Sequence, residues 1–420
     1  GYNAARLYGS LQAALGVYAT MRFSRDGLRL DDRAVAGLGA LTLVWCPNIV
    51  GAVIWYDADV TLITLLTGLV LYRAWSDRST PLWAFAGGVG CAISFWFKQD
   101  VGAGALFGGA VAACIIGAEE RDSRRPIAFI AGAALVFIAV IGLFAWTRTL
   151  GDYWSRGVLR AINFKWVEGP QDHVTLRKLI SPFTTRIDRS SKGIVLLYSL
   201  APVLAYRAYR AGDRAALAAA GASFMWLAAF YSGLMTHGRQ AYTTKVATLT
   251  AVLAVSWRYL PASFGVAARR ALLAFALLLA WYPVSRWGKM TVGKTVPVTS
   301  DKLQGLRVME YDADLDALIA YIKAKIPASD ELLLFYPMVA YFATGRAAPT
   351  PAIDLRETLP ADEDKILGAL VARKPRWYIR RGGLEEHRAD DFGGMPRLKE
   401  WIVGRYQYHD RVGGDRFSVE

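Results

Sequence analysis

The sequence predicts a polytopic α-helical membrane bundle of about ten transmembrane helices, with a C-terminal extracytoplasmic α/β domain. Hydrophobic residues make up 54% of the chain. Several apolar runs approach the roughly 20 residues that a helix needs to cross about 30 Å of hydrocarbon. From Asp301 onward the pattern changes, and short helical and strand-like segments alternate. The first two observations predict the bundle, and the third predicts the domain.

The predicted spanning segments all lie within residues 1–288. The shorter ones cross the hydrocarbon with the help of tilt or of flanking anchors. Their approximate bounds are Ala4–Met21, Ala34–Ile54, Val60–Tyr72, Pro81–Phe97, Val101–Gly117, Ile127–Trp146, Gly193–Tyr206, Ala215–Met235, Ala247–Trp257 and Leu272–Pro283.

The connections between these segments alternate in charge. Arginines are concentrated in every second connection, namely Arg22–Arg33, Arg73–Arg78, Glu119–Arg125, Arg207–Arg214 and Arg258–Arg270. The positive-inside rule assigns such connections to the cytoplasm. The other connections and both ends of the given chain then face outward. A start on the outer side leads us to expect at least one further helix upstream of Gly1.

The net charge of +14 does not indicate a nucleic-acid partner, because many arginines lie in short connections where membrane topology explains them. Membrane lipids are the expected surroundings. The three cysteines, Cys46, Cys91 and Cys114, lie inside apolar segments. They are interpreted as small core residues rather than as parts of a disulfide framework.

A long outer connection, Thr147–Lys192, carries its own pattern. Its apolar and aromatic residues recur at spacings of one, three and four, as in an amphipathic helix at the membrane interface. Pro170 and Pro182 interrupt this pattern. Such helices either seal a bundle or act as a lid over a lipid-facing groove, and the sequence leaves both readings open.

The predicted α/β domain covers residues 289–420. Helical spacing is found at Asp314–Lys325, Ala361–Arg373 and Leu398–Val403, strand patterns at Glu331–Tyr336 and Arg376–Arg380, and a hairpin pattern at Tyr406–Val419 around Gly413-Gly414. This segment contains no GxGxxG, GxxxxGK, HExxH or CxxC motif. The usual phosphate-binding and zinc-binding motifs are therefore absent from its sequence.

Three predicted outward-facing turns, Tyr56–Asp59, Lys98–Asp100 and His237–Lys245, gather polar residues at one membrane depth. Lysine and arginine can hold a phosphate and stabilise it as a leaving group. A carboxylate can act as a base toward a hydroxyl or bind a divalent metal ion. These turns predict a site for a lipid-phosphate substrate. The candidates are Asp57 and Asp59 as catalytic residues and Lys98, Gln99, His237, Arg239 and Tyr242 as substrate-binding residues.

Each candidate also has a structural explanation. The two carboxylates can simply end and restart helices at the water interface, and Lys98 can extend to that interface after an aromatic run. His237 can be a helix cap. Arg239 can be an outward-facing anchor, and Tyr242 a residue of the aromatic belt.

Several short runs carry a resemblance to a known family. They are Ala4-Ala5-Arg6-Leu7 at the start of a helix, Asp57 and Asp59 before Val60–Tyr72, and Phe97-Lys98-Gln99 at the end of a later helix. With these runs, most of the chain resembles the bacterial membrane glycosyltransferases of the GT-C superfamily, relatives of protein O-mannosyltransferases and of the lipid A aminoarabinose transferase. Tyr341–Arg346, followed by Pro349-Thr350-Pro351, is similar to the outer domain that many members carry.

The resemblance implies a polyprenyl-phosphate-linked sugar as donor and transfer to a lipid, glycan or protein acceptor on the outer face of the bacterial inner membrane. It also implies an essential Asp in a first outer loop, which we expect upstream of Gly1. Asp57 and Asp59 are then candidates for a second acidic site that contacts a metal ion or the acceptor.

By the same resemblance, Lys98, His237 and Arg239 are implied as phosphate contacts. For Arg346 two readings remain, because it either reaches toward the site or follows Gly345 in a turn.

Two other functions stay open. A transporter or flippase for a lipid-linked sugar often shows internal repeats, and we find no convincing repeat between Ala4–Trp146 and Gly193–Pro283. The third alternative is a non-catalytic subunit of a membrane complex, in which the acidic turn is an interface. Sugar transfer by the purified protein distinguishes the enzyme from both.

Overall fold

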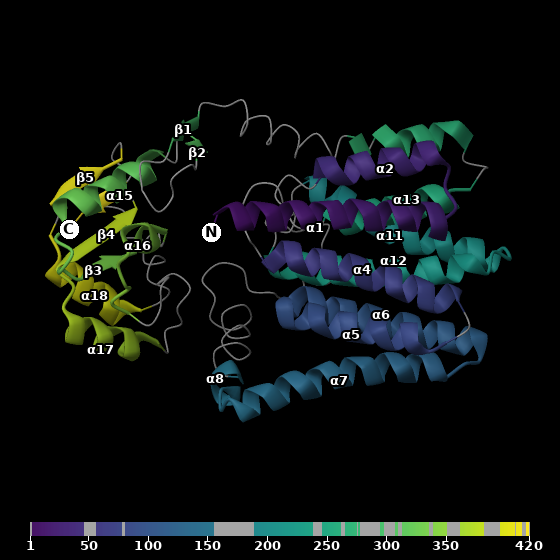
Figure 1. Ribbon diagram of the computed structural model, residues 1–420, viewed down its shortest axis with the longest axis horizontal. Coiled ribbons are helices and arrows are strands. Elements are labelled where there is room, and N and C mark those ends of the chain that lie inside the picture. The colour runs from purple at the N-terminus through teal and green to yellow at the C-terminus, as the bar shows by residue number, and fades with distance from the viewer. Residues whose placement is uncertain are drawn as a thin grey trace. The chain divides into compact units, whose positions relative to one another are not determined.

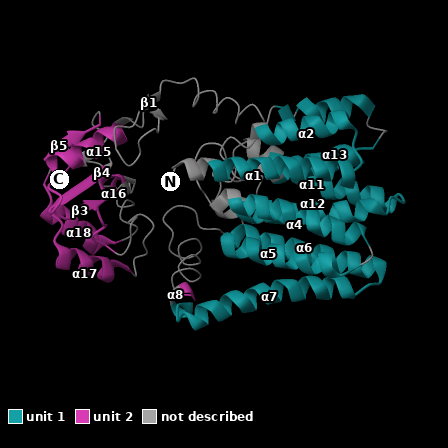
Figure 2. Ribbon diagram, viewed as in Figure 1, with its two compact units in different colours: residues 1–151, 174–287 teal, residues 152–173, 288–420 magenta. Residues whose placement is uncertain are grey.

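The computed structural model describes residues 2–45, 56–77, 80–154, 189–237, 246–261, 265–274, 276–277, 295–297, 307–309, 313–335, 339–350, 362–381, 395–407, 409–413 and 417–419. The chain divides into two compact units (Figure 2). Unit 1 contains Gly1–Gly151 and Val174–Trp287, and unit 2 contains Asp152–His173 and Gly288–Glu420. Each unit is described by itself.

Unit 1 is built from long helices that pack side by side (Figure 1). They are α1 (Tyr2–Arg22), the π-helical turn η1 (Phe23–Gly27), α2 (Asp32–Trp45), α4 (Tyr56–Ser76), α5 (Leu82–Phe97), α6 (Gln99–Glu120), α7 (Arg124–Trp146), α11 (Arg189–Arg210), α12 (Ala215–His237) and α13 (Val246–Tyr259). The short helix α8 (Leu150–Asp152) follows α7.

Membrane character is visible in three of the described helices. Gln99–Glu120, Arg124–Trp146 and Ala215–Gly233 are long and apolar enough to cross a membrane, and the apolar helix Leu82–Phe97 is shorter. The chain is therefore compatible with an α-helical membrane protein. The full set of about ten spans stays a prediction.

The helices of unit 1 alternate in direction. Along α6, Gly104 faces Ala228 of α12 and Gly108 faces Met225, so the two helices run antiparallel. Along α5, Gly87 faces Leu71 of α4 and Gly90 faces Thr67, so α4 and α5 are antiparallel too. The starts of α4 and α6 therefore lie at the end of unit 1 where α5 and α12 finish. We call this the polar end.

The opposite end holds the Arg-rich connections and is called the arginine end. The hydroxyl of Tyr72, near the end of α4, donates to the main-chain oxygen of Gly27 in η1 at 2.7 Å. The hydroxyl of Tyr209, near the end of α11, donates to Glu119, near the end of α6, at 2.9 Å. The predicted alternation of charged connections is thus reproduced in the packing of these helices.

Glycines allow the closest helix crossings. A Cβ added at Gly88 of α5 would overlap the main-chain oxygen of Phe129 of α7, and one added at Gly132 of α7 would overlap the main-chain oxygen of Phe85. Small residues at such positions let helix backbones approach one another, which is how membrane helices gain packing contacts.

Two predicted helix starts are wrong. Helix α6 begins at Gln99 rather than at Val101, so Gln99 and Asp100 of the predicted turn are helical. The sequence pattern predicts a turn over Tyr56–Asp59 and a helix from Val60, whereas α4 begins at Tyr56. Asp57 and Asp59 therefore lie in the first turn of the helix. Acidic residues are favourable there because the positive end of the helix dipole lies beside them, so the helix extends past the apolar run.

The described residues of unit 2 form two sheets. In the larger one the strand order is β3-β4-β6-β5, and in the smaller one β1 (Thr295–Pro297) pairs antiparallel with β2 (Arg307–Met309). Strands β3 (Leu332–Leu334) and β4 (Trp377–Arg381) are parallel. Strand β6 (Phe417–Val419) pairs antiparallel with both β4 and β5 (Asp410–Val412).

Helices cover both faces of the larger sheet. Residues of α15 (Ala313–Lys325) and α16 (Val339–Thr344) share one hydrophobic cluster with Leu332 and Leu334. Residues of α17 (Glu363–Arg373) and α18 (Pro396–Arg405) share another with Leu333. This alternation along β3 is the period of two that a strand buried on both faces requires.

Five elements predicted for this part of the chain are confirmed within two residues at each end by α15, β3, α17, β4 and α18. The predicted hairpin Tyr406–Val419 is confirmed by β5 and β6, although β5 begins four residues later, at Asp410. Gly413 follows β5 with φ of 69°, the left-handed conformation that favours glycine. Of the predicted interfacial segment Thr147–Lys192, residues 155–188 lie outside the described residues.

Candidate functional site

Asp59 joins α4 to α1 at the polar end. The hydroxyl of Tyr8 donates a hydrogen bond to Asp59 Oδ1 at 2.5 Å, and Gln12 Nε2 donates to the same oxygen. Tyr8 and Gln12 are four residues apart on α1, so they lie on one face of that helix. Two donors on one helix thus converge on a single carboxylate oxygen of the neighbouring helix.

The two oxygens of Asp59 differ in their surroundings. Oδ1 receives both donors, whereas for Oδ2 the described part of the chain provides no hydrogen-bond partner. The side chain is partly exposed. A carboxylate held in this way keeps one oxygen available for a hydroxyl or an ion at the polar end.

Tyr8 and Gln12 were missed by the reasoning from sequence. Both lie inside the predicted spanning segment Ala4–Met21, where the apolar pattern draws attention away from single polar residues. A signal did exist, because a polar side chain within a membrane helix usually has a partner or a function. What the sequence does not reveal is that the partner is Asp59, about 50 residues away.

Lys98 lies where α5 gives way to α6. Its backbone is extended, with φ of −154° and ψ of 105°. Its amide donates to the oxygen of Ser94 at 2.9 Å, and its own oxygen accepts the amide of Gly102 at 2.9 Å. Lys98 therefore ends one helix and begins the next.

Lys98 is 8% exposed. Gln99 and Asp100 follow it in the first turn of α6, where the helix dipole favours negative charge. The Asp100 carboxylate accepts the amide of Val101 at 2.8 Å. A lysine beside a helix N-terminus is an arrangement suited to holding a phosphate.

The other candidates are described in part. Asp57 lies in the first turn of α4 and His237 ends α12, so both backbones are at the polar end, but their side chains lie outside the described residues. Arg239 and Tyr242 also lie outside them. The structure thus brings Asp59, Lys98, Gln99 and the end of α12 to one end of unit 1.

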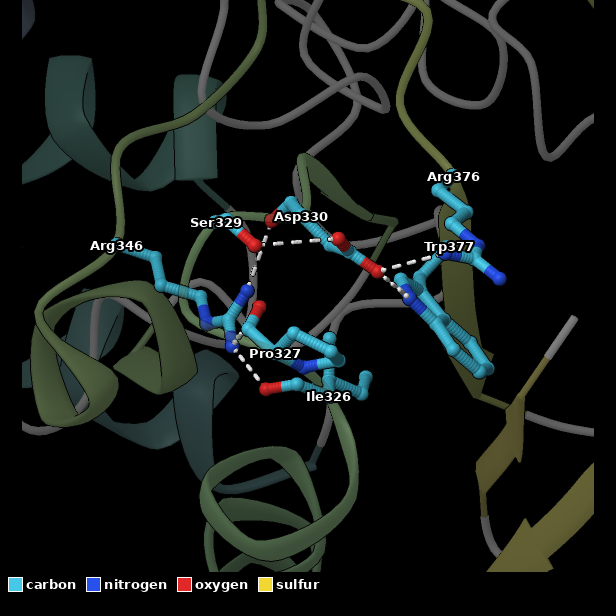
Figure 3. A network of polar contacts seen from close by, with 7 residues as sticks. All are labelled: Ile326, Pro327, Ser329, Asp330, Arg346, Arg376 and Trp377. Carbon is cyan, nitrogen blue, oxygen red and sulfur yellow. Dashed lines mark hydrogen bonds and ion pairs between the residues drawn. The ribbon is translucent and has the colours of Figure 1, made fainter.

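Arg346, a candidate substrate-binding residue, belongs to unit 2 (Figure 3). Its guanidinium donates to the main-chain oxygens of Ile326 at 2.6 Å, Pro327 at 3.0 Å and Asp330 at 2.9 Å. These oxygens follow the end of α15, where helix carbonyls lack partners within the helix. Gly345 has φ of 72°, which supports the turn as the role of this segment.

The same loop is fixed from its other side. The Asp330 carboxylate accepts Trp377 Nε1 at 3.0 Å and pairs with Arg376 at 3.5 Å, so it joins the loop to β4 (Figure 3). A pocket of about 390 Å³ lies beside this network and is lined by both Arg346 and Asp330. Both of these charged groups are already engaged, Arg346 with main-chain oxygens and Asp330 with Trp377 and Arg376. The pocket therefore has a structural character.

Within the described ranges, no group of three or more His, Cys, Asp or Glu side chains is arranged to hold a metal ion. Comparisons with known proteins add no assignment. No family model matches the sequence, and no curated protein matches it. The residues of the polar end and their geometry are therefore the basis for a functional assignment.

Proposed function

We propose that this protein is a membrane glycosyltransferase that moves a sugar from a polyprenyl-phosphate donor to a lipid, glycan or protein acceptor on the outer face of a bacterial inner membrane. One observation carries the proposal. Asp59, with one oxygen held and one available, and the buried Lys98 lie at the same end of a bundle of apolar helices. A base and a cation at one end of an apolar bundle suit a substrate with a charged head group and an apolar tail.

In the proposed reaction, Asp59 Oδ2 takes the proton of the acceptor hydroxyl. The hydroxyl oxygen forms a bond to the anomeric carbon as the bond from that carbon to the phosphate oxygen breaks, and the electron pair leaves on the phosphate. Lys98 and the start of α6 stabilise the developing charge, because groups already aimed at a leaving phosphate need no reorganisation during the reaction.

The remaining candidates are given roles in the same proposal. His237 and Arg239 are proposed as further phosphate contacts, Gln99 and Tyr242 as sugar contacts, and Asp57 as a second carboxylate near the acceptor or a divalent ion. The polyprenyl tail is proposed to lie against exposed apolar helix surface such as that of α7, where Ile138 is 70% exposed. The positive-inside rule supports an outward-facing polar end, because the arginine end is opposite to it.

The test is transfer of radiolabelled sugar from a polyprenyl-phosphate donor by the full-length protein in detergent. We expect Asp59→Asn and Lys98→Met each to lower the rate by about 100-fold, the scale of a lost base or a lost charge-stabilising group. Asp32→Asn and Lys365→Met, at exposed positions, are the matched controls and retain full activity.

Full transfer by correctly inserted Asp59→Asn and Lys98→Met proteins would remove the assignment of both residues. If reconstituted protein moves the lipid-linked sugar between leaflets without transferring it, the chain is a transporter. If the protein neither transfers the sugar nor moves the lipid-linked sugar between leaflets, the remaining function is that of a non-catalytic subunit.

A further inference from the structure

The two oxygens of the Asp59 carboxylate are hydrogen-bonded unequally, and helix packing alone does not require this difference. Two side chains of α1 donate to this one oxygen. A carboxylate oxygen that accepts two donors cannot rotate away without breaking both bonds. The direction of the other oxygen, Oδ2, is therefore set by residues that do not belong to α4.

The burial of Gln12 strengthens this point. This residue is 8% exposed on a helix whose neighbouring residues are largely apolar. Burying an amide away from water is unfavourable unless its groups are hydrogen-bonded. The bond to Asp59 satisfies one N–H of the Gln12 amide, so each group restricts the orientation of the other.

A second contact region joins α1 to α4. At the arginine end, the ring of Phe23 in η1, which follows α1 directly, packs edge-on against Tyr72 of α4 with centroids 5.1 Å apart. Tyr72 also donates to the main-chain oxygen of Gly27. The association of α1 with α4 therefore has a basis that is independent of Tyr8 and Gln12.

We propose that Tyr8 and Gln12 are positioning residues for Asp59. They hold Oδ1 so that Oδ2 faces the acceptor hydroxyl, and they do not themselves touch the reacting atoms. This inference rests on the proposed function, and it adds to that function the residues that orient its base. A misplaced base lowers the rate of the chemical step more than it weakens substrate binding.

The experiment measures kcat and KM for sugar transfer by Tyr8→Phe and Gln12→Met, each alone and in combination with Asp59→Asn, in the full-length protein. We expect each single variant to lower kcat by about tenfold with little change in KM, the signature of an interaction that acts on the chemical step. In the Asp59→Asn background we expect no further loss, because the group to be positioned is no longer a base.

Tyr18→Phe is the matched control. Tyr18 lies on the same helix and is 60% exposed, and its hydroxyl has no partner among the residues that the structure describes. We expect this variant to have unchanged kcat. Tyr8→Phe keeps the ring and removes one hydroxyl at an exposed position, so it tests the inference even if Gln12→Met folds poorly.

Equal losses with and without the Asp59→Asn substitution would overturn the positioning role, because a structural effect does not depend on the carboxylate. Full activity of both single variants would also overturn it. If Asp59→Asn abolishes transfer while the single variants are unaffected, this inference fails and the proposed function stands. If the wild-type protein transfers no sugar, the proposed function fails first.

Discussion

The indole nitrogen of Trp226 donates a hydrogen bond to the main-chain oxygen of Thr64 at 3.1 Å. This bond joins α12 to α4, the helix that carries Asp59. Trp226 is 1% exposed, and its indole occupies the space beside Gly68, one turn further along α4. The position of α4 in unit 1 thus depends on the large indole of Trp226 on α12, which fits against α4 where Gly68 has no side chain.

Gly68→Ala is expected to destabilise unit 1. The added Cβ would overlap the Trp226 indole, and forcing extra volume into a packed site costs about 1–3 kcal/mol. The measurement is the Tm of the purified protein in detergent. Gly37→Ala is the control, since nothing lies within 4 Å of its added Cβ. Equal Tm values for the two variants would contradict the packing.

Gly132→Ala is expected to be more damaging, because the obstacle is backbone. Its Cβ would meet the main-chain oxygen of Phe85 on α5, which cannot move aside as a side chain can. Gly142→Ala lies on the same helix with nothing within 4 Å, so it controls for helix propensity. We expect a lower Tm and a smaller folded fraction for Gly132→Ala alone. A normal yield and Tm would show that α5 and α7 do not cross here.

Arg125→Met is expected to lower stability at the arginine end. The Arg125 side chain is 4% exposed and pairs with Glu120 at 2.8 Å and with Asp122 at 3.5 Å. Removing one partner of such a part-buried charged hydrogen bond costs about 1–3 kcal/mol, because the other charge loses its partner. Arg124→Met removes the same charge from an exposed position. Similar losses in both variants would point to net charge rather than to the pair.

Arg346→Lys is expected to loosen the loop that follows α15. Lysine keeps the charge but cannot direct a planar fork of donors at three main-chain oxygens. Hydrogen exchange of the Ile326 amide, which donates to Ile322 at 3.2 Å, should become faster while transfer activity is retained. The opposite pattern, unchanged exchange with lost transfer, would return Arg346 to the substrate-binding residues.

Tyr406 gives unit 2 a dependence on alkaline pH. Burial raises the pKa of Tyr406 to about 12, and its hydroxyl donates to the main-chain oxygen of Pro375 at 2.7 Å. Because the folded state holds this proton more tightly than the unfolded state, the stabilisation is complete below about pH 10 and is lost as the pH rises through about 12.

Tyr406→Phe removes both the bond and the ionisation. The Tm of the wild-type protein should exceed that of the variant at neutral pH, and the difference should shrink as the pH rises above about 10. A difference that stays constant across this range would show that the hydroxyl ionises equally easily in both states.

The sequence was sufficient for much of the local structure. Apolar runs near the length of a membrane span predicted helices such as α6 and α12, and the short strand pattern Glu331–Tyr336 predicted β3. Charge in the connections predicted which helix ends lie together. The start of α4 was missed, because two carboxylates interrupted the apolar run although a helix N-terminus tolerates them.

For the candidate site, the location of its residues was predictable but their contacts were not. Asp59, Lys98 and Gln99 could be placed at one end of the bundle by counting helices, since antiparallel neighbours return to the same end. The sequence could not predict that Tyr8 and Gln12 donate hydrogen bonds to Asp59. Nor could it predict that the Arg346 guanidinium binds three main-chain oxygens.

The amino-acid sequence by itself therefore determined the apolar helices, their alternation and the end at which the polar residues gather, because the length of an apolar segment and the charge of a connection are local properties of the chain. The tertiary structure alone decided which side chains meet. Such contacts depend on the rotation and depth of each helix against the next, which are set by packing at positions such as Gly68 and Gly132 far from the contacts themselves.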